Sequence, residues 1–277
     1  MCILTAKYFK GLGFVAVKNR DRNYTPVINF RKSNRNGMER LYIWDENTRY
    51  TEGLNEHGVA ILSASLMTKD DEKEHTKGED TRDYYSPDGK KIRDALLCTS
   101  VREAVRKLID DCLSGHTLIF DQDHCYVLEG AKLRDNGYAY QVQKVNPNNT
   151  VTRTNHGVLM PRAGYQRGVD EAQTCSRISS ESRLKIAECM TDLASSPMDL
   201  LDRLTYHECE NPQLNACRLD TRPSQLKTTG QLMIVPSKKT LYYRPIMCEI
   251  NFDYWRVNHP DSKTYFELCG MRPLLQD

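Results

Sequence analysis

Long apolar runs and an excess of one charge are both missing from this 277-residue sequence. No apolar run approaches the roughly 18 residues that a membrane span requires, and the N-terminus lacks the basic and then apolar segments of a secretory signal. Lysine and arginine number 39 and aspartate and glutamate 37. We therefore expect a cytoplasmic protein with a small-molecule partner, and we expect neither nucleic acid nor a membrane to bind it.

Cysteine pairs of the C-x-x-C type are also absent, although the chain has ten cysteines. Because they are scattered and no secretory context is evident, we expect most of them to be reduced, buried, small apolar residues. Possible metal ligands occur together at residues 207–210 with Cys217, but their spacing matches no common zinc motif. The sequence therefore predicts neither a metal nor another cofactor.

The order of the predicted elements indicates one layered domain. Alternating apolar residues around a glycine-rich turn predict a hairpin over residues 2–7 and 13–18. Periodicity predicts strands over 40–44, 58–66, 116–120, 125–129, 138–145, 232–235 and 240–244, and helices over 100–112, 180–193 and 197–204. Without repeats or linker-like stretches, this order favours a single α+β domain in which two sheets pack together with helices outside.

A charged segment over residues 69–91 interrupts these elements. It is too charged to be buried and too long for a routine connection, and it follows a strand that should line the functional site. We interpret it as a lid that gates the site, in which Tyr84 and Tyr85 would contact the substrate. The alternative is a solvated insertion without a role.

Cys2 directly follows the first methionine. Removal of that methionine would give one residue both a thiol and a free α-amine, so that it would supply a nucleophile and a base. The reference pKa values are roughly 8.5 for a thiol and 7.7 to 8.0 for an α-amine, so proton transfer between them is inexpensive. A second-position cysteine can also simply begin a buried strand, so partner residues must decide.

Four polar residues further along the chain could support such a nucleophile. Asp21, across the predicted hairpin, could hold the amine, and Lys18 could lower the thiol pKa or meet an acidic substrate group. Asn155 lies at a predicted strand end, where its amide suits a developing oxyanion. Each has a simpler interpretation: residues 18–22 as a solvated turn, Asn155 as a turn residue, and Arg183 as an exposed residue after a serine helix cap.

Five short motifs, taken in order, resemble the N-terminal nucleophile hydrolases. They are Met-Cys-Ile at 1–3, Lys-Asn-Arg-Asp at 18–21, Glu-Gly-Leu-Asn-Glu-His-Gly at 52–58, Thr-Asn-His at 154–156 and Ser-Ser-Glu-Ser-Arg at 179–183. The most similar group is that of choloylglycine hydrolase, penicillin V acylase and acyl-CoA:penicillin acyltransferase, and the agreement extends over roughly residues 2–190. The resemblance implies a four-layer αββα sandwich and cleavage of a linear, non-peptide carbon–nitrogen amide bond through an acyl-cysteine.

Residue roles follow from the same resemblance. It implies that Cys2 is the nucleophile, that Asp21 orients the amine, that Asn155 supplies the side-chain half of the oxyanion hole, and that Arg183 is the family arginine near the nucleophile. By itself, the motif at 52–58 is an ordinary turn followed by a strand.

Two further positions are predicted to contact the substrate. Ser65 stands where the family usually has an asparagine or tyrosine beside the oxyanion hole. Lys18 stands where the family usually has arginine. A planar guanidinium, which can donate two parallel hydrogen bonds, is thus replaced by a compact ammonium group. The exchange keeps the positive charge and changes its geometry.

Other functions remain open on the sequence. The same Cys2 could serve an acyltransferase or a glutamine amidotransferase, although the Arg-Gly-Pro-Asp and His-Thr-Arg segments of the latter are absent. The chain could also bind a small molecule without catalysis. A homo-oligomer is compatible with all of these alternatives.

Overall fold

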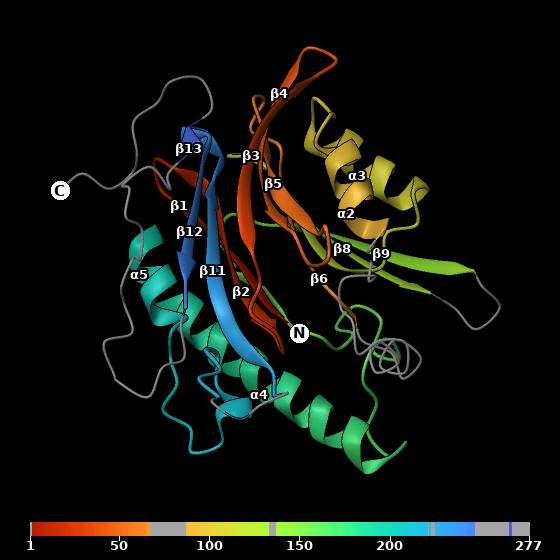
Figure 1. Ribbon diagram of the computed structural model, residues 1–277, viewed down its shortest axis with the longest axis vertical. Helices are drawn as coiled ribbons and strands as arrows, with labels where there is room; N and C mark the ends of the chain where they lie inside the picture. Colours follow the sequence, from red (N-terminus) through yellow and green to blue (C-terminus); the bar gives the residue numbers. More distant parts are fainter. Residues whose placement is uncertain are drawn as a thin grey trace.

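A computed structural model describes residues 2–66, 87–132, 137–220, 222 and 225–246, together with the backbone of 266–267. In this part of the chain two antiparallel sheets face each other, and helices cover both outer faces (Figure 1). Tyr84, Tyr85 and the larger part of the predicted lid lie outside the described residues. Among the described residues, no helix is long and apolar enough to cross a membrane.

The first sheet is built around the predicted N-terminal hairpin. In spatial order its strands are β10 (Val151–Arg153), β1 (Cys2–Phe9), β2 (Gly13–Arg22), β11 (Lys227–Val235), β12 (Thr240–Pro245) and β13 (Phe266–Glu267). Gly13 in the hairpin turn has φ +80°, and a Cβ there would lie 2.1 Å from the Gln122 carbonyl oxygen. The turn therefore requires glycine at this position.

The second sheet contains two strands that the sequence did not predict. Its spatial order is β3 (Ile28–Arg35), β4 (Met38–Asp45), β5 (Thr51–Asn55), β6 (Ala60–Ala64), β7 (Gly115–Phe120), β8 (Cys125–Lys132) and β9 (Tyr138–Val145). The edge strand β3 is mostly polar and partly exposed, so it lacks an apolar signal. The interpretation of residues 52–58 as a turn is wrong for its first half, because β5 is a fully buried strand.

Side chains of successive residues on β2 enter different layers. Phe14 and Ala16 pack between the sheets, whereas Val15 and Val17 pack on the opposite face, as the two-residue period of a strand requires. That opposite face is covered by α4 (Glu171–Leu193) and α5 (Pro197–Arg203), which contribute Ala187, Leu200 and Leu201 to the same cluster.

The outer face of the second sheet is covered by α2 (Pro87–Ala95) and α3 (Val101–Asp110). As predicted, α3 begins behind Ser100, whose side chain accepts a hydrogen bond from the Glu103 N–H. The order of layers is thus helices, sheet, sheet and helices (Figure 1). This architecture confirms the predicted α+β, four-layer αββα fold class.

Two predicted boundaries are corrected by the structure. Residues 87–91 do not belong to a lid, because Pro87 begins α2, and Gly89 and Ile92 are buried in it. The predicted helix over 180–193 begins nine residues earlier, at Glu171 behind the cap residue Asp170. Ser180 therefore lies inside a helix and does not cap one.

Half of the eight described cysteines are buried. Cys2, Cys98, Cys125 and Cys217 are buried, Cys112 and Cys209 are intermediate, and Cys175 and Cys189 are exposed. The expectation of burial is therefore wrong for the two cysteines that the long helix α4 presents to solvent, and Cys248 and Cys269 lie outside the described residues.

Candidate active site around Cys2

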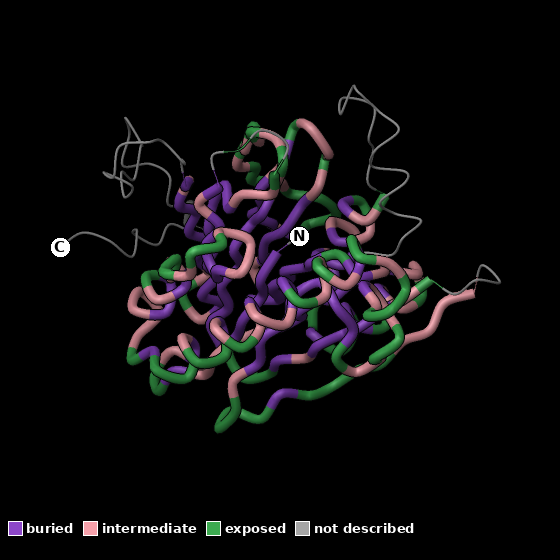
Figure 2. The backbone as a smooth tube through the Cα atoms, turned by 90° about the horizontal axis from the view of Figure 1, so that it is seen from below, coloured by how far each residue is buried: buried purple, intermediate pink, exposed green. Residues whose placement is uncertain are grey.

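Cys2 is the first residue of β1 and is buried, and the tube beside the N-terminal label is coloured as buried in Figure 2. Cys2 is 3% exposed and pairs in register with Arg20 on β2. Because paired residues share a face and faces alternate along a strand, Lys18, Arg20 and Arg22 lie on the same side as Cys2, toward the second sheet. Asp21 lies on the other side, toward α4.

The Cys2 thiol is surrounded by positive charge. Arg22 Nη1 lies 3.5 Å from Cys2 Sγ. Burial raises the pKa of the thiol, but the charges of Lys18 and Arg22 outweigh burial and lower that pKa to about 6. At pH 7 the thiol is therefore mostly a thiolate, which is the reactive form of cysteine.

Lys18 forms a buried ion pair behind the thiol. Its Nζ lies 2.6 Å from Glu52 Oε1 and 2.5 Å from the Ser63 carbonyl oxygen, and both ionic side chains are almost fully buried. Burial lowers the pKa of Lys18, while Cys2 and Glu52 act to raise it. Lys18 thus influences the thiol, and its ammonium group is already held by Glu52 and Ser63.

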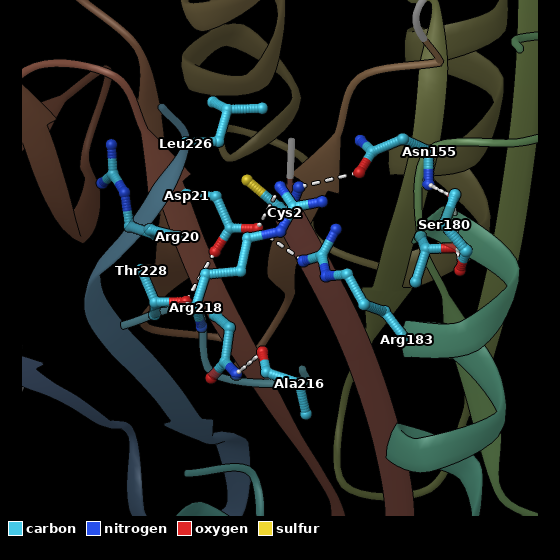
Figure 3. A network of polar contacts seen from close by, with 12 residues as sticks. Cys2, Arg20, Asp21, Asn155, Ser180, Arg183, Ala216, Arg218, Leu226 and Thr228 are labelled. Atoms are coloured by element: carbon cyan, nitrogen blue, oxygen red, sulfur yellow. Dashed lines mark hydrogen bonds and ion pairs between the residues drawn. The ribbon is translucent and has the colours of Figure 1, made fainter. Parts of the chain in front are cut away.

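Asp21 is fixed on the helix side of the sheet by two arginines and a threonine (Figure 3). Its Oδ2 accepts from Arg183 Nη2 at 2.5 Å and from Arg218 Nη1 at 3.4 Å, and its Oδ1 accepts from the Thr228 hydroxyl at 2.8 Å. All four side chains are buried. The simple interpretations of Asp21 as part of a solvated turn and of Arg183 as an exposed residue are therefore wrong.

Asn155 contacts the main chain of Cys2 (Figure 3). Its Oδ1 accepts a hydrogen bond from the Cys2 nitrogen at 3.0 Å, and its Nδ2 donates to the Ser65 carbonyl oxygen at 2.7 Å. These two partners fix which amide atom is oxygen and which is nitrogen. The amide group carries two N–H bonds, and Ser65 engages one of them.

The main chain around Asn155 is also anchored. The Asn155 N–H donates to the Ser180 hydroxyl of α4 at 3.0 Å. Glu129, which is fully buried, accepts from the successive N–H groups of Val158, Leu159 and Met160 in the loop that follows. The Asn155 side chain therefore projects from a rigid segment, as a positioned hydrogen-bond donor requires.

The structure brings together every described residue that the sequence proposed for the site. Asn155 binds the main chains of Cys2 and Ser65, and Arg183 binds Asp21. Arg22 links these two groups, because its Nη1 contacts both the Cys2 thiol and the main-chain oxygen of Asp21. Ser65 is exposed and therefore lies at the solvent side of the site. Their proposed roles in catalysis and substrate binding remain predictions.

Three residues of the site were not identified from the sequence. Glu52 was assigned to a turn, and Arg22 was included only in a solvated one, although strand alternation places Arg22 on the same face as Cys2. Arg218 precedes β11 in an irregular segment, so no periodic pattern indicates it. Burial and the neighbouring Arg183 lower the pKa of Arg218 to about 9, and it still carries its charge at pH 7.

In the part of the chain that the structure describes, no group of three or more His, Cys, Asp or Glu side chains could hold a metal ion. The site consists instead of a thiol, amide groups and paired charges. Such a set is suited to nucleophilic attack on a carbonyl carbon and to stabilisation of the oxyanion that results.

Comparison with known proteins relates this geometry to a fold. No protein-family model matches the chain, and no curated protein is similar to it in sequence. Among solved structures, penicillin V acylase from Agrobacterium tumefaciens matches with a TM-score of 0.50 and 12% identity, over 88% of this chain and 82% of that one. The chain therefore has the αββα fold of an N-terminal nucleophile hydrolase.

Two other solved structures are similar to a lesser degree. An N-acylethanolamine-hydrolyzing acid amidase ortholog from Caenorhabditis elegans matches with a TM-score of 0.48 and 13% identity, over 97% of this chain and all of that one. The C2A mutant of a conjugated bile acid hydrolase from Clostridium perfringens matches with a TM-score of 0.47 and 14% identity, over 88% of this chain and 89% of that one.

Proposed function

We propose that the protein hydrolyses the linear carbon–nitrogen amide bond of a small N-acyl compound through an acyl-cysteine at Cys2. The observation that carries this proposal is a buried cysteine with a pKa of about 6 at the first residue of β1, with Asn155 bound to its main-chain nitrogen. The fold shared with an acylase supports the same reaction class.

The first half of the reaction forms a thioester. The Cys2 thiolate attacks the amide carbon, a C–S bond forms, and the π electrons of the carbonyl move to oxygen. The remaining N–H of Asn155 is the candidate donor to this oxyanion. When the carbonyl reforms, the C–N bond breaks, and the departing nitrogen takes a proton from the α-ammonium group of a Cys2 from which Met1 has been removed.

The second half regenerates the enzyme. The α-amine accepts a proton from water as the water oxygen attacks the thioester carbon. The tetrahedral intermediate then collapses, the C–S bond breaks, and the carboxylic acid leaves with Cys2 again a thiolate. An amine in place of this water would make the enzyme an acyltransferase, and the acceptor preference decides between these two reactions.

Asp21 has an indirect part in this mechanism. Arg183, Arg218 and Thr228 hold its carboxylate on the helix side of the sheet, where the end of β2 lies beside the first residue of β1. We infer that its negative charge favours an ammonium group at the Cys2 nitrogen, while Asn155 Oδ1 supplies the direct hydrogen bond. We also propose that the substrate is a small amide and that the protein is cytoplasmic.

The test is a panel of N-acyl amino acids, bile-salt-like conjugates and phenoxyacyl amides, analysed for released amine and for the mass of the acyl-enzyme. The wild-type protein should release amine from at least one class, and Cys2→Ala should release none while remaining folded. Cys98→Ala is the matched control, because Cys98 is also buried but lies in the layer between the second sheet and its helices. Tight binding without release would identify a non-catalytic binding protein.

A further inference from the structure

In the described part of the chain, Arg22 differs from the other positive side chains around Cys2 because no carboxylate lies at hydrogen-bonding distance from it. Lys18 pairs with Glu52 at 2.6 Å, Arg20 with Asp45 at 3.1 Å, and Arg183 with Asp21 at 2.5 Å. Among the described residues, the carboxylate oxygen nearest to Arg22 belongs to Asp45 and lies 3.9 Å from Arg22 Nε.

That carboxylate is already shared. Asp45 Oδ2 accepts from Arg20 Nη2 at 3.1 Å and from the Tyr24 hydroxyl at 3.0 Å. Arg22 Nη1 instead donates to Cys2 Sγ at 3.5 Å and to the main-chain oxygen of Asp21 at 2.8 Å. Within the described residues, the close anionic partner of Arg22 is therefore the Cys2 thiolate.

Arg22 is also the solvent-accessible member of this group. Its side chain is 16% exposed, whereas Lys18, Arg20, Arg183 and Arg218 are at most 1% exposed. A substrate group that approaches the thiol from solvent can therefore reach the Arg22 guanidinium without displacing a buried ion pair.

The sum of the charges around Cys2 also favours an anionic group on the substrate. The group contains five positive side chains, Lys18, Arg20, Arg22, Arg183 and Arg218, and three carboxylates, Asp21, Asp45 and Glu52. The thiolate offsets one of the two excess positive charges of these side chains, and the α-ammonium group that the mechanism assigns to Cys2 adds one. A partly buried charge without a partner is costly, so the site favours a ligand that supplies negative charge.

We propose, on the basis of the proposed function, that Arg22 holds the Cys2 thiolate in the free enzyme and binds an anionic group of the substrate, next to the scissile amide, as the thiolate is consumed. A carboxylate is the matching chemistry, because guanidinium binds it through paired N–H donors.

The contact between Arg22 and the substrate carboxylate should speed acylation, because Arg22 becomes available to it as the thiolate reacts. When Sγ forms its bond to the carbonyl carbon, the negative charge leaves sulfur and moves to the carbonyl oxygen. Arg22 then loses its anionic partner, and a substrate carboxylate replaces it. The contact therefore strengthens as acylation proceeds, so it raises kcat as well as affinity.

The first experiment requires no substrate and uses two alkylating probes of similar size, anionic iodoacetate and neutral iodoacetamide. Modification of Cys2 is followed by peptide mass spectrometry, with the exposed Cys189 as an internal reference in the same sample. We expect the iodoacetate-to-iodoacetamide rate ratio at Cys2 to exceed the ratio at Cys189 by about tenfold or more, the size of a charge-assisted hydrogen bond.

Two substitutions test Arg22 directly. Arg22→Gln should lower the ratio at Cys2 at least fivefold, Arg22→Lys should retain most of it, and Arg106→Gln, at an exposed arginine on α3, should leave it unchanged. Because the readout is a ratio at one pH, any change in the thiolate fraction cancels. Equal ratios at Cys2 and Cys189 in the wild-type protein, or a ratio unaffected by Arg22→Gln, would overturn the proposal, and the first comparison holds even if Arg22→Gln fails to fold.

The second experiment locates the anion on the substrate. An N-acylglycine is compared with the N-acylethanolamine of the same acyl chain, and an N-butyl monoamide of succinic acid with N-butylbutyramide. We expect the anionic member of one pair to have at least tenfold higher kcat/KM, with kcat contributing, and Arg22→Gln to remove the preference. If the neutral member of both pairs is preferred, the proposal is refuted. If none of the four amides is hydrolysed while Cys2 still prefers iodoacetate, only the proposed amide hydrolysis is refuted.

Discussion

Separating the buried Lys18–Glu52 pair should destabilise the protein more than removing both of its charges. The two charged groups are 2.6 Å apart with side chains 1% and 0% exposed, and Glu52 Oε2 has no hydrogen-bond partner among the described residues. Breaking one buried pair typically costs about 3–5 kcal/mol, a large part of the roughly 5–15 kcal/mol of a whole domain. Lys18→Met should therefore lower the free energy of unfolding by several kcal/mol.

The combined variant Lys18→Met/Glu52→Gln leaves no unpaired charge. It should recover at least about 2 kcal/mol of the summed losses of the two single variants, as measured by urea denaturation in a double-mutant cycle. The control is the Lys107–Asp111 pair at the C-terminal end of α3, which is also 2.6 Å apart but has side chains 41% and 24% exposed, so Lys107→Met should cost less than about 1 kcal/mol. Two results would refute the interpretation that burial makes the separated charges costly. One is that Lys18→Met lowers the free energy of unfolding as little as Lys107→Met does. The other is that the double variant loses the exact sum of the two single losses.

Further predictions concern the reaction and its pH dependence. Asn155→Ala should slow acylation by about 10² to 10³-fold with a smaller change in substrate affinity, as measured by single-turnover kinetics, and an unchanged rate would place the oxyanion hole elsewhere. Asp21→Asn should reduce turnover while iodoacetamide still alkylates the thiol, and simple unfolding would make Asp21 structural. Because the folded-state pKa of Cys2, about 6, lies below the ordinary value of 9.0, the unfolded chain binds more protons between these values. Wild-type stability should therefore rise relative to Cys2→Ser from pH 6 to 9, and parallel curves would contradict the lowered pKa. Burial lowers the pKa of His116 to about 3, so His116→Gln should weaken the loss of stability below pH 6.5, as measured by thermal unfolding.

Much of the fold could be predicted from local patterns. The hairpin of β1 and β2 carries clear alternation, the helix α3 has a capping residue in Ser100, and the buried strand β6 lies in a nearly continuous run of apolar and small residues. The edge strand β3 carries none of these signals, because its side chains lie largely in solvent. The length of α4 was underestimated, since its N-terminal half is polar and only a few of its residues are buried.

Within the site, the local sequence indicates which residues have side chains suited to catalysis or binding. Tertiary structure decides which of these side chains come into contact. Asp21 and Asn155 were proposed from short motifs, but the Arg183 contact to Asp21 spans 162 residues of sequence. The partner of Lys18 could not be predicted, because residues 52–58 resemble a turn and only sheet pairing makes Glu52 part of a buried strand. Arg218 depends on the same long-range assembly.

The main-chain geometry of Asn155 also depends on distant contacts. Its N–H partner, Ser180, lies on α4, and the loop after it is held by Glu129 of β8. From sequence, Ser180 resembles a helix cap and Glu129 the end of a strand. Both become positioning groups only when α4 and β8 come together around the segment that carries Asn155.

The central claim is that a processed Cys2 forms an acyl-enzyme, and intact-mass spectrometry tests it most directly. Wild-type protein mixed with excess amide from the active class and quenched in acid should show one mass without Met1 and a second mass larger by the acyl group. Tandem mass spectrometry should place that group on Cys2, and Cys2→Ala should show neither the adduct nor turnover. Active protein that retains Met1, or turnover by Cys2→Ala, would contradict the account.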